Sequence, residues 1–449
     1  MKKLLFIYLI IFTVFILSCG NKVTKPMEAI FYYDVNNTET DKFNIMTLNK
    51  EGKQVVVNDV EFKKIAESSH AIVYIQSGQS FDMNNVRNLF TRFEANYDEE
   101  LRIYGEPISF PTINNDKLVF LIYVFYPESE GDFAGFFNPS DFYDNKPDTF
   151  NKGKYMYINI KTISNTDEIV GTMFHEFQHL INASVNIIND RRTMDLWLNE
   201  ALSESTSVLF APDTALDRKL FFNFFHYCSF YSWKIDEIMG VIHNQQGQSL
   251  NSIYFSYSSS SVFMRWIEHI GGREVIRDIA HSSTSLDTRS RLVNSVKGLN
   301  IGNNVEEIFI SWIKDIYKGN LPGVQVKELP LDPNINPLIT DKGLPLLPGG
   351  FIIYDANEYN LDNVQGLSKE LLDESKNLYL VWNPKFDSVD AEGHVSENDV
   401  IWINATKISP SSTATSKSEM LNFDYSKFSR MPIDKVLTPE EVMRAKSRK

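Results

Sequence analysis

The sequence predicts an α+β protein with a mixed sheet and helices in its N-terminal part, a helical part after it, and a small β-rich domain at the C-terminus. Short runs rich in β-branched and aromatic residues dominate residues 29–160, and apolar residues at helical spacing dominate residues 166–320. Six of the 17 prolines fall within residues 321–350. A chain of 449 residues has room for two or three domains at about 150 residues each.

The composition is that of a globular protein. Hydrophobic residues make up 43% and charged residues 23%, which excludes a fully disordered or fibrous chain. The chain carries 44 Lys and Arg against 58 Asp and Glu, a formal net charge of -14. An acidic balance of this size disfavours a general surface for nucleic acid or anionic membrane, so no nucleic-acid partner is expected.

The first residues predict export. Lys2 and Lys3 precede an unbroken apolar stretch, residues 4–17. This stretch is short for a membrane span and has the length of a signal-peptide core. It leads into Cys19 and Gly20, and this junction resembles the lipobox of bacterial lipoproteins, in which the cysteine becomes the acylated first residue.

The resemblance implies a signal peptide at residues 1–18 and a lipid on Cys19. Residues 19–28 would be a tether that holds the protein at the cytoplasmic or the outer membrane. The alternative is an ordinary secretory leader with an incidental cysteine. Cys228 is the other cysteine, so the mature chain is expected to lack an internal disulfide.

The N-terminal α+β part is expected at residues 29–165. Residues 81–104 have apolar residues at helical spacing, and the order reads strand, helix, strand, strand. The strands are expected at Ala29–Asp34, Ala71–Gln76, Lys117–Tyr126 and Lys154–Ile160.

The helical part is expected at residues 166–320. Its first helix has Asn165 as N-cap with Glu168 three residues on, a capping-box arrangement. The helices are expected at residues 165–181, Met194–Phe210, Ser260–Ile270, Arg273–Ala280 and Val305–Tyr317.

The C-terminal domain is expected at residues 351–449, after a proline-rich extended connector at residues 321–350. Its strands are expected at Gly350–Ala356, Leu378–Trp382 and Val400–Asn404.

The first expected helix carries the segment HEFQH at residues 175–179. Because residues four apart share one helix face, His175 and His179 can bind one metal ion together. Glu176 flanks them and can face a water at that ion. A solvated helix face is the alternative for the same residues.

A third ligand is predicted on the following helix. Asn182 and Val185 stand where metzincin proteases carry a glycine and a third histidine, so that class is excluded. If the two helices pack antiparallel, Glu200 reaches the ion opposite the imidazoles and leaves one position open. Glu204, one turn on, can accept the free N–H of one imidazole. Asn199 is also expected to lie around the metal ligands as a supporting residue.

These residues resemble the gluzincin metallopeptidases, whose thermolysin branch carries HExxH followed by a helix with NExxS and an acidic residue. HEFQH with WLNE at residues 197–200 resembles more closely the hyicolysin family of secreted bacterial zinc peptidases. The resemblance covers roughly residues 70–320. It implies a zincin-type fold, one catalytic Zn²⁺ bound by His175, His179 and Glu200, Glu176 as the catalytic base, and a protein or peptide substrate.

One departure concerns the residue that stabilises the oxyanion. Residues 181–199 contain no tyrosine, although thermolysin-like enzymes place one there. Tyr254 and Tyr257 resemble the downstream tyrosine of other gluzincins, and ordinary aromatic packing stays open for each. Further candidates for a donor are His226, His243, His269 and His281.

The leading hypothesis is a membrane-anchored, zinc-dependent endopeptidase. The strand Tyr155–Ile160, just ahead of the metal helix, is expected to be the sheet edge with which an extended peptide pairs. The acidic stretch at residues 387–399 misses the EF-hand spacing and is interpreted as a solvated loop. The alternatives are a surface-exposed binding lipoprotein or adhesin that keeps the fold without turnover, and a hydrolase of a non-peptide amide or ester.

Overall fold

The computed structural model describes residues 29–48, 54–125, 134–143, 150–162, 166–188, 194–226, 229–233, 242–243, 249–250, 253–333, 336 and 338–408. The predicted signal peptide, Cys19 and the tether lie outside the described residues, as do Asn165, Cys228 and residues 409–449. Among the residues described, no helix combines the length and the apolar character that crossing a membrane requires.

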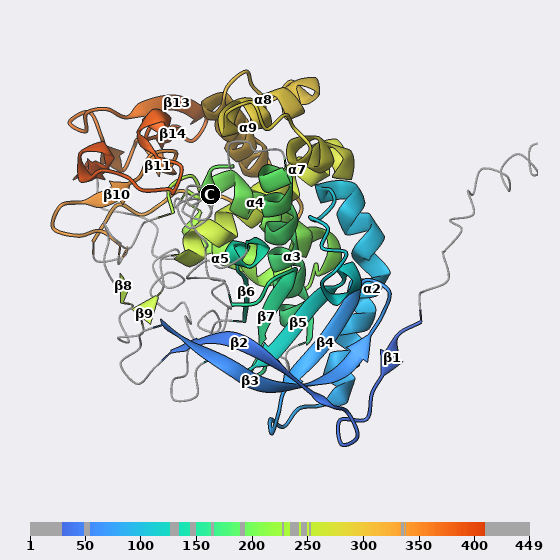
Figure 1. Ribbon diagram of the computed structural model, residues 1–449. Helices are drawn as coiled ribbons and strands as arrows, with labels where there is room; N and C mark the ends of the chain where they lie inside the picture. The colour runs from blue at the N-terminus through green and yellow to red at the C-terminus, as the bar shows by residue number, and fades with distance from the viewer. Residues whose placement is uncertain are drawn as a thin grey trace, which may run out of the picture.

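A mixed sheet forms the N-terminal part and confirms the α+β class (Figure 1). Its order is β1-β3-β4-β5-β7-β6, with β2 paired to β3. Strands β4, β5 and β7 run parallel, and the other pairs are antiparallel. The strands are β1 (Phe31–Tyr32), β2 (Thr40–Leu48), β3 (Gln54–Glu67), β4 (Ala71–Gln76), β5 (Leu118–Tyr123), β6 (Gly135–Phe137) and β7 (Tyr155–Asn159).

Two parts of this sheet differ from the prediction. The expected order omitted the β2–β3 hairpin, because polar residues interrupt its strands and weaken the alternation that marks a half-buried strand. The strand expected at the edge, β7, lies between β5 and β6. The edge is β6, whose three residues are too few to show a period.

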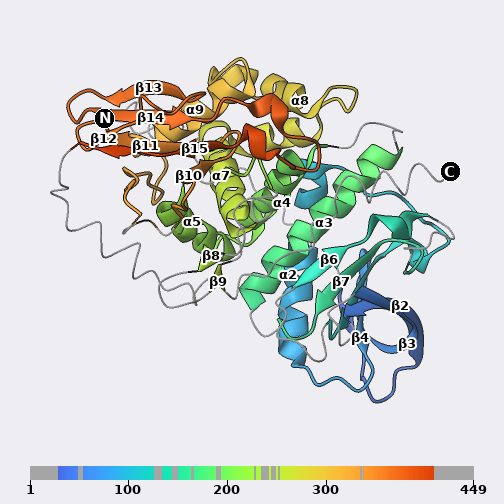
Figure 2. The same ribbon diagram turned by 90° about the vertical axis from the view of Figure 1, so that its left-hand side faces the viewer.

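Helices cover one face of the sheet, and a hairpin covers part of the other. Helices α2 (Met83–Tyr104) and α3 (Thr166–Ile188) pack on one face, where Phe93 meets Phe120 of β5 and Phe174 of α3. The β2–β3 hairpin folds over part of the other face, where Tyr123 donates a hydrogen bond to the carbonyl of Met46 (2.8 Å). Figures 1 and 2 show this layering of helices, sheet and hairpin.

The helical part follows the sheet. It contains α4 (Leu196–Phe210), α5 (Thr214–Phe225), α7 (Ile253–Ala280), α8 (Thr288–Val296) and α9 (Val305–Tyr317), with the short strands β8 (Ile242–His243) and β9 (Ser249–Leu250). The predicted break between two helices after Ile270 is confirmed, because Gly272 within α7 has a non-helical backbone (φ 72°, ψ -178°). The predicted start at Ser260 is wrong, since α7 begins at Ile253. The serine-rich run at residues 256–261 concealed its first turns, because serine favours caps and turns over helix interiors.

The C-terminal part is β-rich. The three predicted strands correspond to β11 (Phe351–Asp355), β14 (Leu378–Trp382) and β15 (Ile401–Ile403). Strands β11, β14 and β13 form one antiparallel sheet, β10 pairs with β15, and β12 pairs with β16. The other strands are β10 (Leu344–Leu346), β12 (Tyr359–Asn360), β13 (Ser368–Asp373) and β16 (Thr406–Lys407).

The proline-rich stretch at residues 321–350 is packed into the protein. Leu321, Leu329 and Leu344 are buried, and β10 within this stretch pairs with β15. Side chains of α5 and α7 share one hydrophobic cluster with the C-terminal strands. The division of the chain into domains stays a prediction, but the C-terminal part is in close contact with the helical part.

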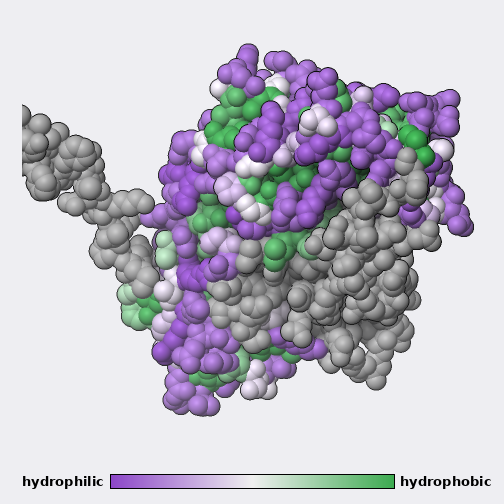
Figure 3. Space-filling view, turned by 180° about the vertical axis from the view of Figure 1, so that it is seen from behind, coloured by the Kyte–Doolittle hydropathy of each residue, from purple (hydrophilic) through white to green (hydrophobic). Residues whose placement is uncertain are grey.

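Apolar residues are largely sequestered inside these layers. Figure 3 shows that hydrophilic side chains cover much of the described surface on one face, with apolar patches between them. Large exposed apolar side chains among the described residues include Phe31 (64% exposed) and Ile408 (56%). Scattered exposed residues of this kind are normal in globular proteins.

Candidate metal centre

Helix α3 carries His175, Glu176 and His179. Its opposite side is apolar, and Phe174 and Phe177 pack against Phe93 of α2. These aromatic contacts fix the rotation of α3, so the two histidines face α4.

Helix α4 presents the matching residues. His175 meets Glu204, in the middle of α4, whereas Asn182 meets Asn199, near its start. The later residue of α3 therefore pairs with the earlier residue of α4, and the two helices run antiparallel.

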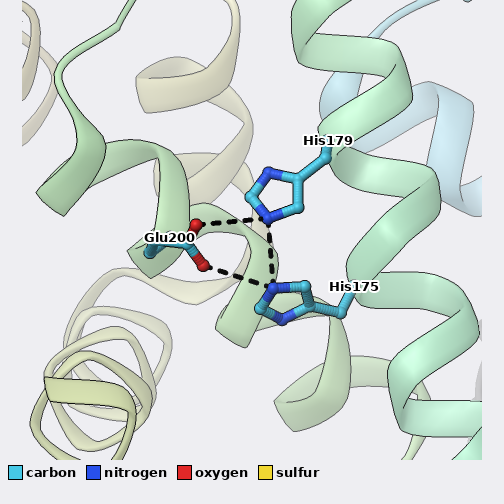
Figure 4. Close-up of side chains that lie close together, drawn as sticks. All are labelled: His175, His179 and Glu200. Atoms are coloured by element: carbon cyan, nitrogen blue, oxygen red, sulfur yellow. Dashed lines mark hydrogen bonds and ion pairs between the residues drawn. The ribbon is translucent and has the colours of Figure 1, made fainter. Parts of the chain in front are cut away.

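Three ligand atoms converge between these helices (Figure 4). The Nε2 atoms of His175 and His179 lie 3.1 Å apart. Oε2 of Glu200 lies 3.3 Å from Nε2 of His175, and Oε1 of Glu200 lies 3.4 Å from Nε2 of His179. Ligand atoms about 2.0–2.1 Å from a tetrahedral zinc ion stand about 3.3–3.4 Å apart, so the spacing suits one such ion.

The outer nitrogen of His179 is held by a hydroxyl. Ser203 Oγ lies 3.0 Å from Nδ1 of His179 and donates its own hydrogen to the side-chain carbonyl of Gln178. The hydroxyl therefore accepts the N–H of His179, and Asn199 Oδ1 lies 3.3 Å from the same Nδ1. This arrangement places the proton on Nδ1 and leaves the Nε2 lone pair for a metal.

The outer nitrogen of His175 faces Glu204. The distance from Nδ1 to Oε1 of Glu204 is 3.5 Å, and Arg218 of α5 contacts both oxygens of Glu204 (3.2 and 3.3 Å). Burial acts to raise the pKa of Glu204, but Arg218 and His175 hold that pKa below its usual value. The carboxylate is therefore ionised and orients His175 with its Nε2 towards the centre.

The side chain of Glu200 fits a bound cation. It is fully buried, and both its oxygens accept no hydrogen bond from the described residues. Burial acts to raise the pKa of Glu200, but the neighbouring imidazoles hold that pKa at about 2. A buried carboxylate between two imidazoles needs a positive charge beside it, which protonated imidazoles can supply in the metal-free protein and a divalent metal ion can supply in their place.

Glu176 points to the edge of the sheet. Its Oε2 accepts a hydrogen bond from the backbone N–H of Phe137 in β6 (2.8 Å). The carboxylate is thereby held between the metal helix and the edge strand, one residue along α3 from His175.

Of the two predicted tyrosines, Tyr257 lies beside the centre. Its ring centroid is 5.9 Å from that of His175, and the guanidinium of Arg218 lies 5.2 Å from the same ring. Tyr254 packs against Phe221 in another hydrophobic cluster. Small residues on α4 and α7, among them Ser205 and Ser258, allow these two helices to pack closely and bring Tyr257 near.

Of the remaining candidates, His226 lies away from the metal centre, and the side chain of His243 lies outside the described residues. His226 is buried beside Phe222, with Nε2 3.1 Å from the carbonyl of Lys327, and burial lowers its pKa to about 4. Asp390, Glu392 and His394 could share a cation by distance, and they lie in the predicted acidic loop. Asp390 is exposed and already accepts hydrogen bonds from the backbone of Glu392 and His394.

Three supporting groups were not predicted. Ser203 stands one turn after Asn199, so the helical spacing carried a signal for it. Arg218 lies on another helix, and nothing in its local sequence links it to Glu204. The N–H of Phe137 is a backbone group, which residue type does not reveal.

The chain resembles a known peptidase. It is 24% identical over 216 residues to the neutral metalloprotease ShpI of Staphylococcus hyicus. The match covers 45% of this chain and 47% of the relative, so the chain spans about half the length of the curated relative it matches. No family model matches the chain. The similarity supports a relationship to metallopeptidases and hence a metal cofactor.

Proposed function

We propose that this protein is a zinc-dependent endopeptidase of the gluzincin type. His175, His179 and Glu200 would hold one zinc ion, and Glu176 would be the catalytic base. The observation that carries the proposal is the convergence of two imidazole nitrogens and a buried carboxylate at the spacing of a tetrahedral site. Two histidines with one carboxylate and an open position are the donor set of catalytic zinc.

The chemistry divides between the metal and the chain. When bound, zinc lowers the pKa of a water and polarises the scissile carbonyl. Glu176 takes the proton of the attacking water and delivers it to the departing amine. The N–H of Phe137 fixes one oxygen of Glu176 (2.8 Å). Tyr257, beside His175, is the proposed partner of the oxyanion.

The substrate would pair with β6. Asn159 donates to the carbonyl of Ala134 (2.8 Å), so the backbone groups of Phe136 also face β7. Those of Gly135 and Phe137 face the other side, where β6 pairs with no other described strand. The N–H of Phe137 binds Glu176 there, so a peptide would pair with the backbone groups of Gly135 and the carbonyl of Phe137. An extended peptide bound there would pass Glu176, and it presents the backbone groups that such pairing needs.

Gly135 lets this edge approach the metal helix. A Cβ at this position would lie 3.0 Å from Thr172 Cγ2 and 3.0 Å from the carbonyl oxygen of Tyr157. We expect Gly135→Val to lower kcat/KM by about a hundredfold with zinc content unchanged, because it displaces β6 from α3. Gly298→Val is the matched control, since open space surrounds Gly298. Parent-like kinetics for Gly135→Val would remove β6 from the substrate site.

Ser203 provides a test of the residues that orient the ligands. Ser203→Ala removes the acceptor for the N–H of His179 and should weaken zinc binding by about 10- to 100-fold. Competition with a chelating dye measures the dissociation constant. Ser184→Ala is the control, because Ser184 is a buried serine of α3 whose hydroxyl bonds Leu180 of its own helix. Equal zinc affinity in the two variants would contradict this role of Ser203.

Proteolysis itself is tested with purified residues 20–449 and an unfolded protein. We expect new peptides by mass spectrometry, their loss with a chelator, and their return with zinc. Zinc binding without any cleavage would support the binding lipoprotein instead. Cleavage of small amides or esters alone would support a non-peptide hydrolase.

We also propose export and lipid anchoring at Cys19, which the leader sequence of residues 1–20 supports. We expect mass spectrometry of the protein extracted from membranes to find an acylated N-terminal peptide that begins at Cys19. A peptide that begins elsewhere, with an unmodified cysteine or without it, would contradict this proposal.

A further inference from the structure

Tyr257 lies beside His175 of the metal centre and packs against a second aromatic residue. The centroid of its ring lies 5.0 Å from that of Trp233, with an angle of 82° between the ring planes, and both side chains are buried. Tyr257 also contacts His175 and Arg218, and Arg218 is the arginine that binds Glu204. The position of Trp233 therefore decides the space left for Tyr257 and, through it, for His175.

The backbone of Trp233 is held by the C-terminal part of the chain. Its N–H donates to the carbonyl of Gly393 (3.1 Å), and the hydroxyl of Ser232 donates to the carbonyl of Pro348 (3.1 Å). Residues 229–233 have no helix or strand of their own. These contacts with distant residues therefore fix their path.

Gly393 belongs to a turn at residues 390–394, and this turn also contacts the helix that carries Glu200. The N–H of Leu196, the first residue of α4, donates to the carbonyl of Ala391 (2.8 Å). The first N–H groups of a helix have no partner within it, so Ala391 supplies one. Figure 2 shows the C-terminal segment, orange to red, beside α4 and α8, and Arg289 of α8 joins Tyr231 to the carbonyl of Phe386.

The backbone of the turn lies close to Trp233 at Gly393. Gly393 has φ +79°, and a Cβ there would lie 2.9 Å from Trp233 Cβ and 3.0 Å from its backbone nitrogen. Asp390 shapes the turn, because its Oδ1 accepts the N–H groups of Glu392 (3.0 Å) and His394 (2.8 Å). A left-handed glycine and a contact shorter than van der Waals distance both exclude a side chain at position 393.

We propose that the turn at residues 390–394 is a positioning element of the metal centre. It holds Trp233 against Tyr257 and fixes the start of α4, so the C-terminal part of the chain completes the site. Gly393 and Asp390 are positioning residues, and neither contacts the metal ligands among the described residues. This inference rests on the proposed zinc site, and it gives the C-terminal part a role within the same enzyme.

The test compares Gly393→Ala with Gly366→Ala. Gly366 also has a left-handed backbone (φ +83°) in the C-terminal part, but the nearest atoms to its Cβ position belong to the Ile401 side chain, at 3.5 Å and beyond. Both variants therefore carry the same backbone strain, and only Gly393→Ala displaces Trp233. The readouts are the visible spectrum of the cobalt(II)-substituted protein, the zinc dissociation constant and kcat.

We expect Gly393→Ala to shift the cobalt bands, to weaken zinc binding several-fold and to lower kcat at least tenfold. Gly366→Ala should match the parent in all three. Parent-like cobalt bands and kcat for Gly393→Ala would overturn the proposal. A parent protein that binds zinc and cobalt but cleaves nothing would instead overturn the proposed function, and the spectral comparison would still test the turn.

A second pair of variants covers the case in which Gly393→Ala does not fold. Asp390→Ala adds no atom and removes the acceptor that shapes the turn. Asp355→Ala removes a similar acceptor, which binds the N–H of Asn357 (2.7 Å), from another turn of the C-terminal part. A cobalt spectrum altered by Asp390→Ala and unaltered by Asp355→Ala supports the proposal, and identical spectra overturn it.

Discussion

Glu176→Gln is expected to lower peptide hydrolysis by roughly a thousandfold or more while leaving zinc content and folding unchanged. The amide has nearly the same shape, and its carbonyl oxygen can still accept the N–H of Phe137. It cannot take a proton from water at neutral pH, so only proton transfer is lost. The measurement is the initial rate on an unfolded protein, with zinc content and thermal unfolding recorded on the same samples.

A control separates this effect from the general loss of a carboxylate. Glu99 lies on α2 and pairs with Arg102 and Arg273 at the surface. Glu99→Gln should retain the parent rate. If Glu176→Gln also retained it, Glu176 would not be the base, and the mechanism proposed here would be wrong.

Glu200→Ala is expected to abolish stoichiometric zinc binding. The variant leaves two imidazoles, and two nitrogen ligands hold zinc far more weakly than three donors that include a carboxylate. Elemental analysis after gel filtration measures the bound metal. Retained stoichiometric zinc would show that another residue is the third ligand.

The same variant makes a second prediction about stability. In the metal-free protein the two imidazoles hold the pKa of Glu200 below its usual value, so its carboxylate stabilises the fold at neutral pH and its removal should lower the unfolding temperature. Zinc should raise the unfolding temperature of the parent, because a ligand that binds only the folded state stabilises it. Zinc should raise the unfolding temperature of Glu200→Ala far less. An equal zinc effect on both proteins would contradict the assignment.

Local patterns allowed the metal helices to be predicted. His175 and His179 are four residues apart, as are Glu200 and Glu204. Residues at this spacing lie on the same face of an α-helix, whatever the helix packs against. The same logic located strands β4 and β14 to the residue, because their apolar runs end sharply at polar or turn residues.

The parts that were missed depend on contacts between distant residues. Strand β6 has three residues and exists because it pairs with β7. Arg218 reaches Glu204 only because α5 packs beside α4, and Gly393 meets Trp233 across 160 positions of sequence. No local period encodes such contacts, so they required the structure.

The C-terminal part illustrates the same point. Its prolines predicted an extended connector and an added domain, and residues 321–350 do lack long helices. Packing of Leu329 and Leu344 into a cluster shared with Phe221 and Phe255 joins this stretch to the helical part. The physical link between the two parts is what makes a positioning role for the 390–394 turn possible.

The central claim is that side chains from α3 and α4 close around one zinc ion. X-ray absorption at the zinc edge of the zinc-loaded protein tests it most directly. We expect two imidazole ligands, the remaining ligands all oxygen, and one imidazole fewer in His179→Ala. A sulfur ligand, a single imidazole in the parent, or an unchanged spectrum in His179→Ala would contradict it.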